Sequence, residues 1–258
     1  MQVVILAGGS GTRLREMTEF LPKALIPIGG IPILVHIMRL YAHYGYNNFI
    51  LALGYKQDEF KKYFTHFNQI NNDITVSIGS YKGDFYSCDY VDEGWTVTLS
   101  DTGETTMKGG RLKRIEKYIK GDTFMMTYGD AVANIDIPAL VAFHKSHGKL
   151  VTITGVHPTP RFGEVHHDNG KVISFSEKPH DDNCLVNGGF MVMNRGIFDY
   201  LVADEWCDLE VGPLELIAAK GELMVYHHRG FWKCLDTLKD MEEFQEMWTK
   251  GNISWRVR

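Results

Sequence analysis

The chain has 258 residues, of which 44% are hydrophobic and 23% are charged, a composition that is typical of a globular protein and excludes disordered and collagen-like chains. A chain of this length can bury a core without disulfides or structural metals, and its four cysteines include no C-x-x-C pair. The 27 Lys and Arg residues against 32 Asp and Glu residues leave a net charge of −5, which argues against nucleic acid or an anionic membrane as a partner because both bind concentrated basic surfaces.

The first predicted element is a run of apolar residues, 3–6, that is typical of a strand buried on both faces. The run is too short for the core of a signal peptide, and no apolar run in the chain reaches membrane-spanning length. Because the cysteines are also far apart in a chain too large for a disulfide scaffold, we expect a cytoplasmic protein.

Strands and helices then alternate along the first half. A glycine-rich loop follows the first strand, and apolar spacing after it predicts a helix that begins at Pro32 and ends at Gly45. The next segments fit in turn a strand, a helix, a strand, a helix and a strand, at residues 48–53, 60–64, 75–78, 111–119 and 124–128. This alternation predicts an α/β fold, a Rossmann-like, doubly wound mixed sheet.

The second half is richer in strands. After a helix introduced by Pro138, strands are expected at residues 150–156, 171–176, 189–193 and 223–226, before a final helix. No repeat or linker divides the chain, so we expect a single domain, residues 1–258. About 1–148 form its first half, with an insertion near 80–110 that makes an oligomer contact or a lid, and about 149–258 form a smaller, strand-rich part.

The glycine loop is the most informative segment. Glycines between a strand and the next element let backbone N–H groups approach phosphate oxygens. Leu14 stands where a dinucleotide fingerprint needs Gly or Ala, and the chain has no Gly-Lys-Ser/Thr triplet of a Walker loop. Arg13 and Lys23 flank the loop, and two such cations are more typical of an anion site than of solvated surface charges.

Two acidic residues are candidate metal ligands. Asp130 follows the strand at 124–128, at the sheet edge where open α/β folds bind their ligands. Asp236 precedes the final helix, and from spacing alone it suits the role of helix N-cap at least as well. Two carboxylates that converge on a phosphate ligand can hold Mg²⁺.

The run LAGGSGTRL at residues 6–14, followed by the Pro22-Lys23 pair, resembles the signature of the nucleotidyltransferases that make nucleotide-sugars. The resemblance implies a nucleoside triphosphate site and makes Asp130 and Asp236 the ligands of a Mg²⁺ cofactor. The nucleotide-binding residues that it implies in this part of the chain are Leu6, Ala7, Gly8, Gly9, Ser10, Gly11, Thr12, Arg13, Lys23, Gly129 and Asp130.

Two further segments resemble the sugar-phosphate site of the same family. The run Glu177-Lys178-Pro179 is similar to its E-K-P segment, whose lysine meets the sugar phosphate, although from spacing alone a Lys before Pro is only a turn residue. The Asn187-Gly188 pair is similar to a turn that binds sugar hydroxyls, although Asn-Gly is also common in tight turns. With Trp232, these residues form the implied sugar-phosphate site in residues 149–258, and the first half, 1–148, is the nucleotide-binding half.

A narrower resemblance concerns the base. Thr105, Gly110 and Arg111 belong to the segment that forms the base pocket in relatives, where a small residue usually follows the glycine. A guanidinium at position 111 can donate to O2 and N3 of cytosine, whereas uracil and thymine offer an N3–H donor there. Over its whole length the chain resembles the glucose-1-phosphate cytidylyltransferases. Ile31, where relatives commonly have Lys, is a departure that leaves the phosphate signature intact.

This resemblance implies CTP and glucose 1-phosphate as substrates, CDP-glucose and pyrophosphate as products, and a homo-oligomer that serves surface polysaccharide biosynthesis. It implies Arg13, Lys23 and Lys178 as the catalytic residues. A uridylyl- or thymidylyltransferase acting on the same sugar phosphate is the alternative within this class. A nucleotide-sugar sensor without activity is the alternative outside it, but the cationic and acidic residues that a sensor could lose are all present.

Overall fold

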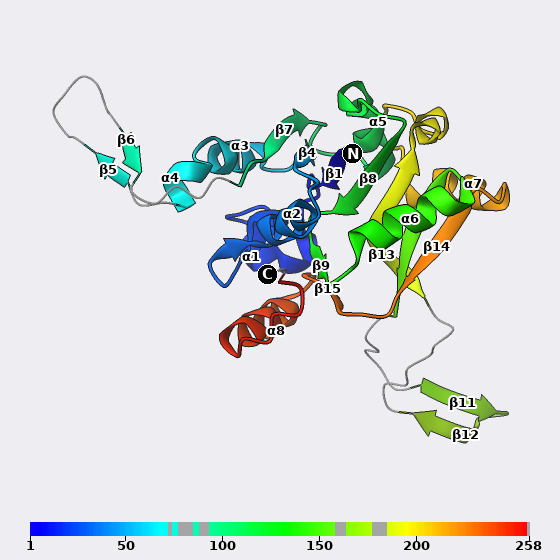
Figure 1. Cartoon of the computed structure of the whole chain (residues 1–258). Helices are drawn as coiled ribbons and strands as arrows, with labels where there is room; N and C mark the ends of the chain where they lie inside the picture. Colours follow the sequence, from blue (N-terminus) through cyan, green and yellow to red (C-terminus); the bar gives the residue numbers. More distant parts are fainter. Residues whose placement is uncertain (72–73, 77–84, 88–92, 158–163, 177–184, 257–258) are drawn as a thin grey trace.

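A seven-stranded mixed sheet forms the centre of the computed structural model, which describes residues 1–71, 74–76, 85–87, 93–157, 164–176 and 185–256 (Figure 1). The strand order is β14-β10-β13-β8-β1-β4-β7. β13 runs antiparallel to both of its neighbours, and the other six strands share one direction. The bounds in this order are Leu223–His228, Val151–Val156, Val186–Asn194, Thr123–Tyr128, Val3–Leu6, Asn48–Leu53 and Thr96–Asp101. The predicted fold class is confirmed.

β1 shows why the sheet needs helices on both faces. Val3 and Ile5 pack into one hydrophobic core with α2 (Ile33–His43), and Val4 and Leu6 pack into a second core on the opposite face. Because successive side chains of a strand point to opposite faces, a continuous apolar run is buried only if both faces are covered. The run at the start of the chain therefore becomes a central parallel strand.

Of the helices that the structure describes, five match predicted ones, whereas three short ones, α1, α4 and α7, were not predicted. The bounds of α1, α3, α4, α5, α6, α7 and α8 are Arg15–Thr18, Gln57–Thr65, Phe67–Asn71, Lys108–Arg114, Ile137–His147, Glu215–Ala219 and Leu238–Thr249. The helix predicted at 111–119 begins earlier, as α5, and a separate 3-10 turn, Glu116–Tyr118, follows it. In the part of the chain that is described, no helix is both long and apolar enough to cross a membrane.

Four small two-stranded sheets complete the part of the fold that the structure describes. They pair β2 with β3, β5 with β6, β9 with β15, and β11 with β12; the strands are Pro27–Ile28, Ile31–Pro32, Ile74–Val76, Phe85–Ser87, Ala131–Ala133, Trp232–Cys234, Glu164–Asp168 and Lys171–Ser176. The pairs β5–β6 and β11–β12 project away from the central sheet (Figure 1). The strand predicted at 75–78 is thus not part of the main sheet, and its last two residues lie outside the described residues.

The segment predicted as an insertion, 80–110, contains part of the central sheet. β7 pairs in parallel with β4, from Thr96 beside Asn48 to Asp101 beside Leu53. Residues 96–101 therefore form an edge strand of the central sheet and are not an insertion into it. The partner of β7 lies almost fifty residues earlier, and local periodicity carries no signal of such a pairing.

Candidate active site

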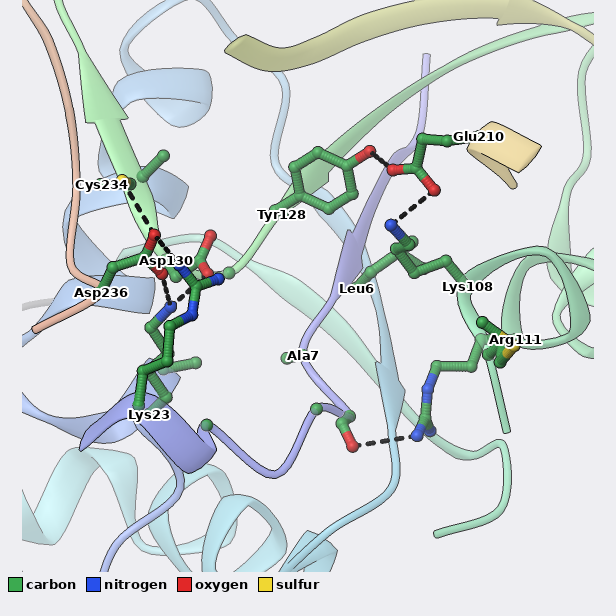
Figure 2. A pocket seen from close by; sticks show the side chains of 18 of the residues that line it. Leu6, Ala7, Lys23, Lys108, Arg111, Tyr128, Asp130, Glu210, Cys234 and Asp236 are labelled. Atoms are coloured by element: carbon green, nitrogen blue, oxygen red, sulfur yellow. Dashed lines mark hydrogen bonds and ion pairs between the residues drawn. The ribbon is translucent and has the colours of Figure 1, made fainter. Parts of the chain in front are cut away.

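A cavity of about 660 Å³ opens where β1 and β8 end, at the carboxyl edge of the central sheet (Figure 2). The end of β1 and the loop after it form one side, and the residues that follow β8 form the floor. In doubly wound sheets the crevice beyond the carboxyl ends of the strands is the usual place for a ligand. The residues from these two segments that line the cavity are Leu6, Ala7, Gly8, Gly9, Gly11, Thr12, Arg13, Tyr128, Gly129, Asp130 and Ala131.

The glycine loop needs its glycines for two different reasons. Gly11 has a φ of +62°, and a Cβ there would lie 2.8 Å from a methyl carbon of Thr18. A Cβ on Gly9 would meet no atom within 4 Å, so the backbone of Gly9 is open to a ligand. Ser10 does not line the cavity, unlike the other residues predicted in this loop. The loop thus offers backbone rather than side chains to the cavity.

Lys23 forms ion pairs with both predicted metal ligands, Asp130 and Asp236. Its Nζ lies 2.7 Å from Oδ2 of Asp130 and 2.6 Å from Oδ1 of Asp236 (Figure 2). The Lys23 side chain is 14% exposed; burial lowers its pKa, but the two carboxylates outweigh burial and the pKa is raised. Burial raises the pKa of Asp236, but the contacts with Lys23 and Arg13 lower it by more, so the net shift is downward. The cluster therefore places one largely buried ammonium group between two carboxyl groups.

Arg13 extends this cluster to the rim of the cavity. Its guanidinium donates to Oδ2 of Asp236 over 2.9 Å, and its side chain is 69% exposed. An ion pair at that exposure contributes little to stability because water screens it. Arg13 is instead available to an anion that enters the cavity.

Asp236 reaches Asp130 through the small sheet formed by β9 and β15. Cys234 pairs with Ala131, and the N–H of Leu235 donates to the carbonyl of Asp130 over 2.8 Å. The pairing brings the residues after β15 alongside the end of β8. Two carboxylates far apart in the sequence thereby face the same ammonium group.

The N-cap of α8 is Thr237, not Asp236. The Thr237 hydroxyl accepts from the N–H of Asp240, and the Asp240 carboxylate accepts from the N–H of Thr237, which forms a capping box. This removes the helix-cap alternative for Asp236 and leaves its carboxylate to the cavity.

Replacing Thr237 by Ala is expected to lower the free energy of unfolding by about 1 kcal/mol, the usual cost of losing a helix N-cap. Urea denaturation of the variant and of the wild type measures this difference. Because the residue caps the helix through its side chain, Thr237→Ser is the matched control and should keep most of the stability. An unchanged unfolding free energy in the alanine variant would contradict the capping role.

The two carboxylates fit a hard divalent cation. Mg²⁺ is held in proteins by one or two carboxylates together with substrate phosphates and water. Asp130 and Asp236 already bind a cation, the ammonium of Lys23, between their oxygens. Among the residues that the structure describes, no group of three or more His, Cys, Asp or Glu side chains could hold a metal by protein ligands alone. The donor set therefore suits an ion that arrives with a phosphate ligand.

Arg111 lines the cavity beside Gly8 but is nearly fully buried, at 4% exposure. One terminal nitrogen donates to the carbonyls of Leu53 and Gly103 and to the Thr102 hydroxyl, and the other donates to the carbonyls of Gly8 and Glu104. Both terminal nitrogens are therefore committed to protein oxygens. A direct contact with cytosine, as expected from the sequence, would have to compete with these bonds.

This guanidinium also leaves no space for a side chain at Gly8. A Cβ on Gly8 would lie 2.2 Å from a terminal nitrogen of Arg111, so only glycine lets the loop pass over the guanidinium.

Thr105 and Gly110, predicted to bind the nucleotide, do not line the cavity. Thr105 donates to the carboxylate of Glu205, and a Cβ on Gly110 would lie 2.2 Å from the carbonyl oxygen of Asp204. Gly110 is therefore needed for packing between α5 and the 204–208 segment.

The predicted sugar turn lies at the same cavity. The N–H of Gly189 donates to the Asn187 side chain over 3.0 Å, and the indole N–H of Trp232 donates to the carbonyl of Gly188 over 2.8 Å. Asn187, Gly188 and Trp232 all line the cavity. The predicted partners Glu177 and Lys178 lie outside the described residues.

A third group of cavity residues was not predicted as part of the site from the sequence. Lys108 on α5, Tyr128 at the end of β8 and Glu210 contact one another on the wall opposite Lys23 (Figure 2). Tyr128 directly precedes the Gly129-Asp130 pair, and that position was its only sequence signal. Glu210 begins a kinked turn, Glu210–Leu214, that no periodic pattern indicates. The other unpredicted lining residues are Ala24, Thr106, Met107, Ala131, Asp208 and Cys234.

The thiol of Cys234 is not a reactive group. Burial, followed by the charges of Asp236 and Asp130, raises its pKa to about 11, and its Sγ lies 3.5 Å from Oδ2 of Asp236. Because the thiolate is the nucleophile, a raised pKa keeps the sulfur inert near pH 7. The cavity thus contains cations and carboxylates but no activated sulfur nucleophile in its described lining.

Comparisons with known proteins agree with this geometry. The model of the nucleotidyl transferase family matches residues 2–247. The chain is 44% identical over 258 residues to the glucose-1-phosphate cytidylyltransferases of Salmonella typhi and of Salmonella typhimurium, covering 100% of this chain and 99% of each relative. The crystal structure of HddC from Yersinia pseudotuberculosis shares the fold, with a TM-score of 0.68 and 23% identity over 96% of this chain and 99% of that chain.

Proposed function

This chain belongs to the nucleotidyl transferase family and, within it, to the glucose-1-phosphate cytidylyltransferases, and from this premise we propose that it converts CTP and glucose 1-phosphate to CDP-glucose and pyrophosphate. The observation that carries the proposal is the cluster of Lys23, Asp130 and Asp236 beside an open glycine loop, at the floor of one cavity. This arrangement suits a triphosphate together with a second phosphate.

The reaction needs no general base. A phosphate oxygen of glucose 1-phosphate attacks the α-phosphorus of CTP, the bond from that phosphorus to the bridging oxygen of the β-phosphate breaks, and pyrophosphate leaves. The attacking phosphate is already ionised, so no proton has to be removed. Catalysis then depends on positioning two anions and on neutralising the charge that develops as they meet.

Each proposed residue has a place in this scheme. The backbone of residues 8–12 holds the nucleotide, and the Lys23 ammonium meets the α-phosphate side of the triphosphate. Arg13, exposed at the rim, neutralises the departing pyrophosphate, and Lys178 binds the sugar phosphate. Asp130 and Asp236 would hold Mg²⁺, which would add positive charge at the triphosphate. Asn187, Gly188, Trp232 and Glu177 contact the sugar.

Pyrophosphate release tests this function directly. The protein is incubated with glucose 1-phosphate, Mg²⁺ and each of CTP, UTP, dTTP and GTP in turn. We expect the highest kcat/KM with CTP. Faster release with UTP or dTTP would instead establish the uridylyl- or thymidylyltransferase, and no release with any nucleotide would favour the inactive sensor.

Replacing Arg111 by Lys tests whether its guanidinium contacts the base of the nucleotide or positions the loop at Gly8. We propose that Arg111 positions the loop at Gly8 rather than reading the base, so kcat/KM for CTP and for UTP should fall by similar factors. The free energy of unfolding should fall by about 3 kcal/mol, because a lysine has no forked donor for the buried carbonyls. Steady-state kinetics and urea denaturation measure the two effects. A loss confined to CTP at unchanged stability would show that the guanidinium reads cytosine.

We further propose that the protein works in a reducing compartment, the cytoplasm, as a homo-oligomer. Cys207 and Cys234 are free thiols, which fits that compartment. The hairpin β11–β12 exposes Ile173 and Phe175, at 69% and 63%, and association would bury such side chains. Light scattering coupled to size exclusion measures the oligomeric state.

A further inference from the structure

We propose that Glu210 is a specificity-determining residue whose carboxylate accepts a hydrogen bond from a hydroxyl group of the glucose ring. The inference rests on the proposed function, because it takes glucose 1-phosphate as the ligand of the cavity. It assigns a role to the wall formed by Lys108, Tyr128 and Glu210, which the catalytic scheme leaves unused.

The position of the Glu210 carboxylate is fixed from two directions. One oxygen accepts from the Tyr128 hydroxyl over 2.5 Å, and the other lies 2.5 Å from Nζ of Lys108 (Figure 2). The backbone N–H groups of Glu210 and Val211 both donate to one oxygen of Asp208, which fixes the turn that carries the side chain. A site that must distinguish similar ligands needs groups held in this way before the ligand arrives.

The same carboxylate retains room for a ligand. Oε2, which pairs with Lys108, is buried, whereas Oε1 accepts from Tyr128 and can accept a second hydrogen bond. The side chains of Glu210 and Lys108 are 31% and 42% exposed, and all three members of the group line the cavity. A purely structural ion pair would not need to face a cavity. The remaining acceptor position on Oε1, beside the Tyr128 hydroxyl, suits one hydroxyl donor of a sugar ring.

The neighbours of the group favour glucose over the ribose of CTP. The Asn187 amide donates to the Tyr128 hydroxyl oxygen over 3.4 Å, so the group is continuous with the turn proposed to bind the sugar. Burial and then the charge of Glu210 raise the pKa of Tyr128, so its hydroxyl stays protonated and remains a donor. Arg111, one turn after Lys108 on α5, bonds to Gly8 on the nucleotide side. These contacts place the group beside the turn proposed to bind the sugar, and the ribose of CTP is the other source of hydroxyls that the experiment has to distinguish.

The test compares wild type with Glu210→Gln, which keeps the shape of the side chain but loses its charge. We expect kcat/KM for glucose 1-phosphate to fall roughly ten- to a hundredfold, the cost of losing a charge-assisted hydrogen bond. The substrates are glucose 1-phosphate and its 2-deoxy, 3-deoxy and 4-deoxy analogues. With an analogue that lacks a hydroxyl bound by Glu210, the two proteins should become nearly equal.

A second pair of substrates, CTP and dCTP, separates the ribose. If Glu210 binds glucose, the preference for CTP over dCTP stays the same in the variant. If that preference disappears while the deoxyglucose analogues behave alike in both proteins, Glu210 reads ribose and the proposal is wrong. Equal kinetics of wild type and variant with every substrate would also overturn it.

Two controls keep these outcomes distinct from other failures. Glu242→Gln, on an exposed position of α8 outside the cavity, should leave the kinetics unchanged. Tyr128→Phe removes the hydrogen bond that holds Glu210 and provides a test even if Glu210→Gln folds poorly. It should lower kcat/KM for glucose 1-phosphate by a smaller factor, and the difference from wild type should disappear with the same deoxy analogue. If the wild type releases no pyrophosphate with glucose 1-phosphate, the proposed function fails rather than this assignment.

Discussion

Replacing Lys23 by Ala is expected to lower kcat by about two to three orders of magnitude, the range seen when one preorganised electrostatic group is removed from a reacting centre. Among the described residues, Lys23 is the single cation in contact with both Asp130 and Asp236, and its side chain is mostly buried. Its charge is therefore already in place when the two phosphates approach. Because the contribution is made to the transition state, kcat should change more than KM.

The same substitution leaves two carboxylates facing each other without their shared cation. We expect a lower unfolding temperature in the absence of Mg²⁺ and a partial recovery when Mg²⁺ is added, since the ion can take the place of the ammonium. Steady-state kinetics and thermal denaturation by circular dichroism provide both readouts. Lys239→Ala, at a solvent-exposed position of α8, is the matched control. A near-normal kcat in folded Lys23→Ala protein would remove Lys23 from the catalytic residues.

The second large effect is expected from the carboxylates. Asp130→Asn and Asp236→Asn should each lower kcat roughly a hundredfold at low Mg²⁺, because an amide oxygen is a weaker ligand for a hard cation. Activity should be partly restored at higher Mg²⁺. Titration of activity against Mg²⁺ concentration gives the apparent affinity of each variant for the ion.

The double variant shows whether the two carboxylates act together. If both hold one ion, the losses should be non-additive, with a coupling energy of about 0.5–3 kcal/mol. Asp199→Asn, exposed and outside the cavity, is the control for adding an amide in place of a carboxylate. Independent, additive losses would show that Asp130 and Asp236 have separate roles, with Asp236 acting chiefly on Lys23 and Arg13.

Local sequence patterns were sufficient to predict the elements whose burial depends on their own residues. The apolar run at 3–6 had to become a central strand, because both of its faces are apolar, and β1 has these bounds. The apolar positions of 33–43 repeat with a helical period, and that face of α2 is buried. The glycine loop likewise follows from its composition, since Gly11 adopts a positive φ that other residues rarely adopt.

The N-cap of α8 could not be predicted from the local sequence. Asp236 and Thr237 are both good N-cap residues and differ by one position, so spacing alone could not choose between them. In the folded chain, Asp240 completes a capping box with Thr237, while Lys23 and Arg13 pair with Asp236. The choice was made by contacts that join the first and last parts of the chain.

By itself the sequence determined the alternation of strands and helices, the glycine loop and the types of charged residue available for the chemistry, because these depend on period, backbone freedom and residue type within a few positions. Only the tertiary structure decided that β7 completes the sheet, that Arg111 supports Gly8, and that Glu210 meets Tyr128 and Lys108. Each of these contacts joins segments separated by many residues, and it forms because packing the two cores brings their backbones together. No local pattern carries that information, since the free energy of such a contact depends on the whole arrangement of the sheet.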